Sequence, residues 1–255
     1  MATLDKFRLD GRTALVTGAG SGLGRAMALA LAEAGADVAA VGRRKALVEE
    51  VAQEIRKRGR KALAAGADVS KAAEVKAAVE RAEEALGPID VLVNAAGVIN
   101  FEPTLELSED AWRAVIDVNL TGAFIVSRAV GAGMVVRGRG SIIHVATFLG
   151  ERGHRAARAA YNASKAGVAG LARALSVEWG PYGVRVNCIS PGAHRTPMSA
   201  QALSNPETER RLREKTVLGR VGEAEDIMGL CVFLASDASS YLTGVNIYED
   251  GGGWI

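Results

Sequence analysis

The residues best suited to acid–base chemistry are Tyr161 and Lys165, which stand four positions apart in the segment YNASK. On a helix, residues at this spacing share one face, so the two side chains are expected to project together. A free tyrosine has a pKa of about 10, which is too high for a useful base at neutral pH. A neighbouring ammonium group stabilises the phenolate and lowers that pKa. We therefore expect Lys165 to lower the pKa of Tyr161 and make it a general acid or base; the alternative is an ordinary tyrosine and lysine on a helix.

A glycine-rich loop, TGAGSGLG over residues 17–24, follows a short aliphatic run and precedes a helix-like stretch. Gly18 permits a tight turn, Gly22 lets the backbone approach a phosphate, and Gly24 allows the helix to pack closely on the strand. The start of the helix offers free N–H groups and a positive dipole end to a pyrophosphate. The loop predicts a dinucleotide site; the alternative is a glycine turn that binds nothing.

The end of the second expected strand indicates which dinucleotide is bound. An acidic residue there would hold both ribose hydroxyls and disfavour a 2′-phosphate. This chain has Gly42, Arg43 and Arg44 at that place, and Asp37 lies at the opposite end of the strand. Arginine binds phosphate through paired, charge-assisted hydrogen bonds. We predict NADP(H) in preference to NAD(H), although Ser21 adds no second positive charge.

Short aliphatic runs alternate with helix-like stretches along the whole chain, which predicts a Rossmann-type, doubly wound α/β fold with helices on both faces of a seven-stranded parallel sheet. No linker interrupts the pattern, so residues 1–255 are expected to form one cofactor-binding and catalytic domain. Regular alternation is lost only around residues 191–221, expected to be a loop or small helices that cover the substrate, or else a surface insertion. The expected strands are Thr13–Thr17, Asp37–Val41, Lys61–Ala65, Ile89–Asn94, Ser141–Ala146, Val184–Ile189 and Val245–Tyr248, with helices at Gly22–Ala34, Lys45–Arg58, Lys71–Ala85 and Ser108–Val136.

Five motifs occur in a fixed order: the glycine loop, VNAAG at 93–97, VNLTG at 118–122, YNASK at 161–165 and SPG at 190–192. Together they resemble the short-chain dehydrogenase/reductase family in its compact single-domain form, over nearly the whole chain from Leu9 to Trp254. The resemblance implies an enzyme that interconverts a secondary alcohol and a ketone by hydride transfer, with Tyr161 as general acid/base. A non-catalytic nicotinamide sensor is the alternative of another class, and intact Asn119, Tyr161 and Lys165 argue against it.

The resemblance also implies roles for individual residues. Lys165 would tune Tyr161 and bind the nicotinamide ribose, and Asn119 would hold a water of the proton relay. Where the family usually has serine, this chain has Thr147, whose hydroxyl can donate the same hydrogen bond to a carbonyl. Asp68 and Asn94 match positions along the adenosine half, and the segment from Pro191 to Thr196 matches the carboxamide side. The full cofactor-binding set is Gly18, Ser21, Gly22, Leu23, Gly24, Arg43, Asp68, Val69, Asn94, Tyr161, Lys165, Pro191, Gly192 and Thr196.

The sequence indicates the substrate less sharply. The stretches GLGRAMALALAEAG and EDIMGLCVFLAS and the DGGGW ending resemble the sugar-acid branch, gluconate 5-dehydrogenase and 2-dehydro-3-deoxy-gluconate 5-dehydrogenase. A keto-sugar acid or polyol is therefore expected, with a 3-oxoacyl thioester reductase or a general carbonyl reductase as alternatives. Basic residues near the expected site would bind a carboxylate or phosphate, or else face solvent or a neighbouring subunit. They are Arg152, His154, Arg155, Arg158, His194 and Arg195.

Composition excludes other classes. The 31 basic and 29 acidic residues alternate in sign, so nucleic acid is not an expected partner. The two cysteines and three histidines have no ligand spacing, so no metal site is expected. No uncharged apolar run reaches the roughly 18–20 residues needed to span a bilayer, and we expect a cytoplasmic protein without membrane contact. The family resemblance implies a homo-oligomer, often a tetramer.

Overall fold

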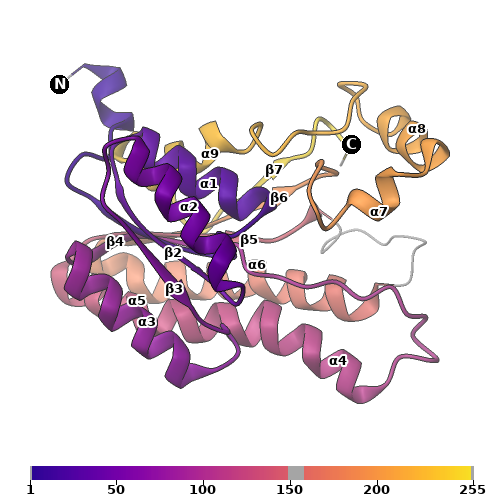
Figure 1. Ribbon diagram of the computed structural model, residues 1–255, viewed down its shortest axis with the longest axis horizontal. Coiled ribbons are helices and arrows are strands. Elements are labelled where there is room, and N and C mark those ends of the chain that lie inside the picture. The colour runs from indigo at the N-terminus through magenta and orange to yellow at the C-terminus, as the bar shows by residue number, and fades with distance from the viewer. Residues whose placement is uncertain (1, 149–157, 254–255) are drawn as a thin grey trace.

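The protein is described by a computed structural model covering residues 2–148 and 158–253. Seven parallel strands form one sheet in the order β3-β2-β1-β4-β5-β6-β7 (Figure 1). Each expected strand is present, with its ends shifted by at most two residues. The strands are β1 (Thr13–Thr17), β2 (Asp37–Gly42), β3 (Ala62–Gly66), β4 (Ile89–Asn94), β5 (Gly140–Val145), β6 (Val184–Pro191) and β7 (Asn246–Glu249).

Helices cover both faces of the sheet, which confirms the predicted doubly wound fold (Figure 1). One buried cluster joins α1, α2 and α9 to one face through residues such as Met27, Val51 and Cys231. The other cluster joins α3, α5 and α6 to the opposite face. Strands β1 and β4 are buried along their whole length, as expected for central strands covered on both sides.

The helices follow the predicted amphipathic stretches closely, with one difference. The stretch expected as a single helix at Ser108–Val136 is α4, a π-helical turn (η2) and α5 in succession. The α-helices are α1 (Gly22–Glu33), α2 (Lys45–Lys57), α3 (Ala72–Leu86), α4 (Glu109–Ile116), α5 (Gly122–Arg137), α6 (Ala159–Trp179), α7 (Ala200–Leu203), α8 (Pro206–Glu214) and α9 (Met228–Ala235); η2 spans Asp117–Thr121.

The stretch Glu109–Arg137 is also long and apolar enough, by length and composition, to cross a membrane, and 44% of the residues in its apolar part are buried within the fold. Val126, Val130 and Met134 of α5 are almost fully buried in the core cluster. The apolar residues of α5 are therefore used to pack the helix on the sheet.

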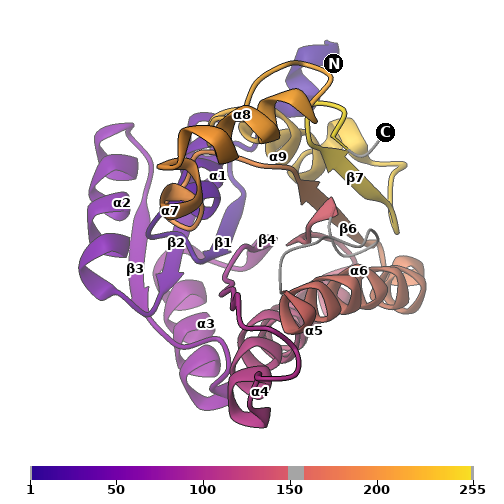
Figure 2. The same ribbon diagram turned by 90° about the vertical axis from the view of Figure 1, so that its right-hand side faces the viewer.

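The chain order reverses between β1 and β4, because β2 and β3 lie on one side of β1 and the later strands lie on the other. In open α/β sheets, ligands bind in the crevice at the carboxyl ends of the strands beside such a switch point. The segment after β6 contains α7 and α8, which lie across this end of the sheet (Figure 2). Small helices are thus present within residues 191–221, and that this segment covers the substrate stays a prediction.

Candidate active site

The glycine loop makes the tight turn from β1 into α1 that the sequence predicts. Gly18 has φ +68°, and a Cβ there would lie 2.7 Å from the backbone nitrogen of Ala96. A Cβ on Gly24 would lie only 2.3 Å from the carbonyl oxygen of Gly18. Leu23 is partly buried against the core. Because only glycine fits at both positions, the loop brings bare backbone to the start of α1, the arrangement that receives a pyrophosphate.

Arg43 and Arg44 are exposed just beyond the end of β2. The Arg44 side chain turns back and its Nη2 donates a 2.9 Å hydrogen bond to Ser21 Oγ. Arg44 thus provides the positive charge that Ser21 does not supply. This contact was not predicted from the sequence, although the two adjacent arginines were a signal for it. Asp37 is held at the far end of β2 by an ion pair with Arg60 at 2.9 Å. Among the described residues, no carboxylate of β2 lies beside Arg43 and Arg44 at the end of this strand.

Asp68 and Val69 follow β3 along the same edge of the sheet. The Ser70 N–H and Oγ donate to Asp68 Oδ1 at 3.0 and 2.8 Å. Burial alone would raise the pKa of Asp68, but these hydrogen bonds and the charges of Arg43 and Lys71 hold it below its ordinary value. Val69 is buried against Gly122 at the start of α5.

Asn94, at the end of β4, turns inward. Its Nδ2 donates to Ser127 Oγ at 3.1 Å and lies 3.4 Å from His144 Nδ1. Burial, together with the charge of Lys165, lowers the pKa of His144 to about 3, so this imidazole is neutral. A small cavity at this place is lined by Thr17, Val69, Asn94, Ala96, Val118, Gly122 and Ala123.

Tyr161, Lys165 and Thr147 come together where β5 and α6 meet. Thr147, two residues beyond β5, is buried and its side chain is hydrogen-bonded to Tyr161. Lys165 is also buried; its Nζ donates to the carbonyl oxygen of Val145 at 2.6 Å and lies 6.0 Å from the centroid of the Tyr161 ring. The predicted helical pairing of Tyr161 with Lys165 is confirmed.

The expected direction of the Tyr161 pKa was wrong. Burial is the largest influence and raises the pKa of Tyr161, while the charge of Arg158 and the hydrogen bond with Thr147 act in the lowering direction. Burial likewise lowers the pKa of Lys165 to about 8. The reason is that both groups lie in the same poorly solvated place, where each charged form is disfavoured, and the ammonium is directed at a backbone carbonyl.

Asn119 lies in the π-helical turn and is buried. Its Oδ1 accepts from the Val98 N–H at 2.8 Å, and its Nδ2 donates to Val98 O and to Ser164 Oγ, both at 2.9 Å. A Cβ placed on Gly97 would lie 3.4 Å from both Asn119 Oδ1 and Lys165 Nζ, so these two atoms flank the same glycine. π-Helical turns inside α-helices are frequent at functional sites, and this one places Asn119 beside the Tyr–Lys pair.

The segment after β6 covers the glycine loop. Thr196 lies over Gly22, where an added Cβ would be 3.3 Å from the Thr196 Cβ. Gly192 donates its N–H to Glu249 O at 2.9 Å, and a Cβ there would clash with Asp250. Pro191 is the last residue of β6. The three residues predicted beside the nicotinamide thus lie at or shortly after the carboxyl end of β6, and Thr196 faces the start of α1.

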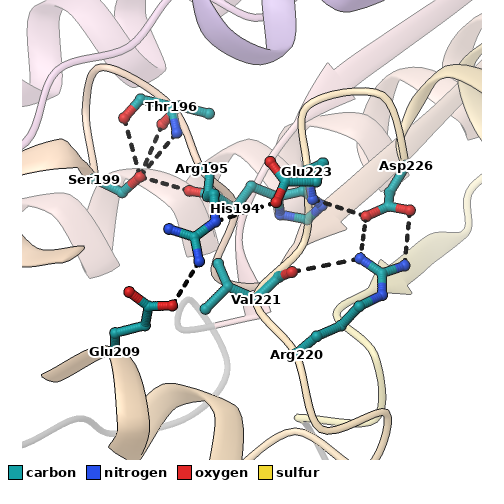
Figure 3. A network of polar contacts seen from close by, with 9 residues as sticks. All are labelled: His194, Arg195, Thr196, Ser199, Glu209, Arg220, Val221, Glu223 and Asp226. Atoms are coloured by element: carbon teal, nitrogen blue, oxygen red, sulfur yellow. Dashed lines mark hydrogen bonds and ion pairs between the residues drawn. The ribbon is translucent and has the colours of Figure 1, made fainter. Parts of the chain in front are cut away.

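Ion pairs fasten this segment to the chain around it (Figure 3). Arg195 binds Glu209 of α8 at 2.6 Å and Glu223 at 3.1 Å. His194 is buried, with its Nε2 2.7 Å from Glu249 Oε2 on β7. Burial would lower the pKa of His194, but Glu249 outweighs it and the pKa is raised. Since both residues face carboxylates of their own chain, the idea that they bind an anionic substrate is not supported.

The remaining basic candidates differ. Arg152, His154 and Arg155 lie outside the described residues. Arg158 precedes the first turn of α6, with its guanidinium carbon 4.9 Å from the centroid of the Phe101 ring. Phe101 was not singled out from the sequence, since only the fold brings the chain after β4 beside α6. Among the described residues, no group of three or more His, Cys, Asp or Glu side chains is placed to hold a metal ion.

Comparison with known proteins agrees with this geometry. Residues 18–253 match the family described as Enoyl-(Acyl carrier protein) reductase. Galactitol 2-dehydrogenase (L-tagatose-forming) from Cereibacter sphaeroides is 41% identical, with 96% of each chain covered. The 2-dehydro-3-deoxy-D-gluconate 5-dehydrogenase of Escherichia coli is 37% identical over 99% of this chain and 98% of the relative.

Among solved structures, the gluconate 5-dehydrogenase from Burkholderia cenocepacia, in complex with NADP and tartrate, superposes with a TM-score of 0.94. It is 37% identical, and 98% of each chain is covered. These matches extend over nearly the whole chain. The chain belongs to the short-chain dehydrogenase/reductase family, and its members named here are dehydrogenases that act on CH–OH groups.

Proposed function

We propose that this protein is an NADP(H)-dependent dehydrogenase/reductase that interconverts a sugar-derived secondary alcohol and ketone, with a keto-sugar acid or polyol as substrate. The observation that carries the proposal is the meeting of Tyr161, Thr147, Lys165 and Asn119 near Gly97, at the carboxyl ends of β4 and β5. The relatives that act on galactitol and on 2-dehydro-3-deoxy-D-gluconate support a substrate rich in hydroxyl groups.

The residues present fit a nicotinamide dinucleotide. The bare backbone at Gly18 and Gly24 would receive the pyrophosphate, and Asp68, Val69 and Asn94 would border the adenosine half. Pro191, Gly192 and Thr196 would border the nicotinamide. When bound, the cofactor supplies or accepts the hydride. The exposed Arg43 and the Arg44–Ser21 pair would hold a 2′-phosphate, which supports the preference for NADP(H). The NADP bound to the Burkholderia cenocepacia enzyme agrees with this choice.

The protein's own contribution to the reaction is proton transfer and positioning. In reduction, Tyr161 donates its phenolic proton to the oxygen of the carbonyl group, and in oxidation the phenolate removes a proton from the hydroxyl. The raised pKa of Tyr161 keeps the proton on the phenol at neutral pH, which suits the donor role. Thr147 donates a hydrogen bond to the same substrate oxygen. Lys165 and Asn119, which both lie beside Gly97, would hold the ribose and the proton relay in place.

The test is a reductase assay that follows loss of NADPH absorbance against keto-sugar acids, neutral ketoses and 3-oxoacyl thioesters. Turnover of a keto-sugar acid or a neutral ketose supports the proposal. Turnover of thioesters alone would contradict the assignment of a sugar-derived substrate, whereas the proposed mechanism would still hold. Tyr161→Phe is expected to lower kcat by about 100- to 10,000-fold while NADPH still binds. Full turnover by this variant would contradict the role of Tyr161, and cofactor binding without turnover of any carbonyl would favour the sensor.

We further propose that the chain acts as one domain and assembles as a homo-oligomer, expected to be a tetramer. Apolar side chains exposed on consecutive helices support the assembly: Trp112 on α4, Phe124 and Val136 on α5, and Val177 on α6. Isolated exposed apolar residues are common, but a group on adjoining helices is typical of an interface. A monomeric mass by light scattering at working concentration would contradict the assembly. The cytoplasmic location stays a prediction.

A further inference from the structure

Among the described residues, Arg158 has no carboxylate partner, whereas Arg195 and Arg220 on the segment after β6 do. Arg195 and Arg220 lie within 2.5–3.1 Å of acidic side chains. Arg158 has no ion pair among the described residues, and its Nε is buried without a hydrogen-bond partner. A guanidinium removed from water without an anion is unfavourable, so such groups are usually paired.

The position of Arg158 is fixed by two elements of the site. It precedes the first turn of α6, three residues before Tyr161, and interacts electrostatically with that tyrosine. Its guanidinium rests on the ring of Phe101, which comes from the chain after β4 and is 52% exposed. The ring supports the flat face of the cation. The guanidinium is therefore held at the site, close to the group that receives the substrate oxygen.

We propose that Arg158, supported by Phe101, binds the carboxylate of the substrate and thereby selects sugar acids over neutral ketoses and polyols. This inference rests on the proposed function, because it assigns the residue that binds the carboxylate end of a substrate whose carbonyl oxygen is bound by Tyr161 and Thr147. A guanidinium binds a carboxylate through two parallel hydrogen bonds. Such an anion would neutralise a cation that is already held in place, so little reorganisation is needed.

The basic residues on the opposite side do not serve this purpose equally well. Arg195 already binds two carboxylates, and His194 faces Glu249. Only Arg158, among these three described candidates, combines partial burial, the absence of an acidic partner and direct electrostatic interaction with Tyr161.

The experiment compares two carbonyl substrates of equal chain length, 5-keto-D-gluconate and a neutral six-carbon ketose, in the wild type and in Arg158→Met. The readout is the ratio of kcat/KM for the acid to kcat/KM for the ketose, because loss of the charge beside Tyr161 alters the rate with both substrates by a common factor. Arg158→Met is expected to lower this ratio about 10- to 100-fold, chiefly through KM for the acid. Arg158→Lys, which keeps the charge and loses the paired geometry, is expected to recover part of it.

Two further variants complete the design. Arg81→Met removes one exposed positive charge from α3 and is expected to leave the ratio unchanged. Phe101→Leu removes the ring beneath the guanidinium and is expected to raise KM for the acid with a smaller effect on kcat.

Calorimetric titration of the NADP⁺ complex with D-gluconate and with D-glucitol gives a readout that does not depend on turnover. Only D-gluconate binding is expected to weaken in Arg158→Met.

The outcomes separate the two proposals. If Arg158→Met lowers kcat/KM equally for both substrates, or leaves the acid unaffected, recognition of the carboxylate is overturned while the proposed function stands. The same holds if the wild type reduces the neutral ketose and not the keto acid. If the wild type reduces neither substrate, the proposed function fails and this inference fails with it. Melting temperatures of all variants identify any loss of folding.

Discussion

The Nζ atom of Lys165 donates a hydrogen bond to the carbonyl oxygen of Val145, the last residue of β5, at 2.6 Å. This contact ties α6 to the carboxyl end of a central strand, one turn of helix away from Tyr161. The ammonium group of Lys165 is therefore held in place whether Tyr161 is protonated or not. Burial has already lowered the pKa of Lys165 to about 8, and it loses its charge more readily than a surface lysine.

Thr147 should be needed for turnover through its hydroxyl and not through its methyl group. Thr147→Ala removes the hydrogen bond with Tyr161 and the donor to the substrate oxygen, and kcat is expected to fall about 100- to 1,000-fold. Thr147→Ser keeps the hydroxyl and is expected to retain most of the activity. Single-turnover rates with NADPH would measure both. Full activity of Thr147→Ala would remove the residue from the mechanism.

The pH dependence should differ between the two reaction directions. Because the pKa of Tyr161 is raised, the phenol stays protonated through neutral pH. Reduction uses the protonated form, so its kcat is expected to be flat through neutral pH and to fall only in the alkaline range. Oxidation uses the phenolate, so its kcat is expected to rise about tenfold per pH unit below that pKa. Arg158→Met should shift the rising part of the pH profile for oxidation to higher pH, since Arg158 lowers the pKa of Tyr161. Parallel profiles in the two directions would contradict this assignment.

Cofactor preference should depend on Arg43 and Arg44. The double variant Arg43→Ala/Arg44→Ala is expected to lower kcat/KM for NADPH about 10- to 100-fold, because charge-assisted contacts to the 2′-phosphate are lost. NADH, which lacks that phosphate, is expected to change by less than about threefold. Arg44→Ala alone would test the contact with Ser21. A wild type that strongly prefers NADH would refute the cofactor prediction.

The contact between His194 and Glu249 should make stability depend on pH. Because the pKa of His194 is raised in the folded state, its charged form stabilises the protein. This contribution is complete below the unfolded pKa of about 6.5 and is lost as the pH rises through the folded value. In Glu249→Gln, the melting temperature is expected to fall by about 2–4 °C near pH 6 for each kcal/mol lost, and by less at pH 8 or above. Thermal unfolding of both proteins from about pH 5.5 to 8.5 would show whether their difference narrows.

Two glycine-to-alanine changes should have opposite effects. In Gly24→Ala the new methyl group would lie 2.3 Å from the carbonyl oxygen of Gly18, so the loop must shift, and both stability and NADPH affinity are expected to fall. Gly170, inside α6, has nothing within 4 Å of an added Cβ. Gly170→Ala is expected to stabilise the protein by about 0.5–1 kcal/mol through helix propensity. Denaturant unfolding and NADPH titration of the two variants would test this contrast.

The sequence was sufficient for the features that repeat regularly or depend on neighbouring residues. The strands could be predicted because buried parallel strands are continuous aliphatic runs, and Tyr161 and Lys165 could be paired because helical spacing sets their faces. The π-helical turn at Asn119 could not be predicted, since its residues, DVNLT, include no proline or glycine that would mark an irregular helix. The pairing of Arg44 with Ser21 and of Arg158 with Phe101 depends on chain segments that only the fold brings together.

The error in the Tyr161 pKa has a similar cause. Spacing along a helix shows that two groups share a face, but it does not show how little water reaches them. In the fold, burial acts on the phenol and on the ammonium together, and the nearest effective charge on Tyr161 comes from Arg158. The solvation of a residue depends on all the elements packed around it, so sequence spacing could not settle the direction.

The π-helical turn Asp117–Thr121 means that the stretch from α4 to α5 holds extra chain that an uninterrupted α-helix would not contain. An α-helix rotates by about 100° for each residue. The wider π turn absorbs the extra residue, whereas the same residue in a regular α-helix would turn α4 by about that angle relative to α5. Val115 would then leave its buried position, and Asn119 would no longer reach Val98 and Ser164. The irregular turn is therefore needed for two features of the fold. They are the packing of α4 and the orientation of the Asn119 amide.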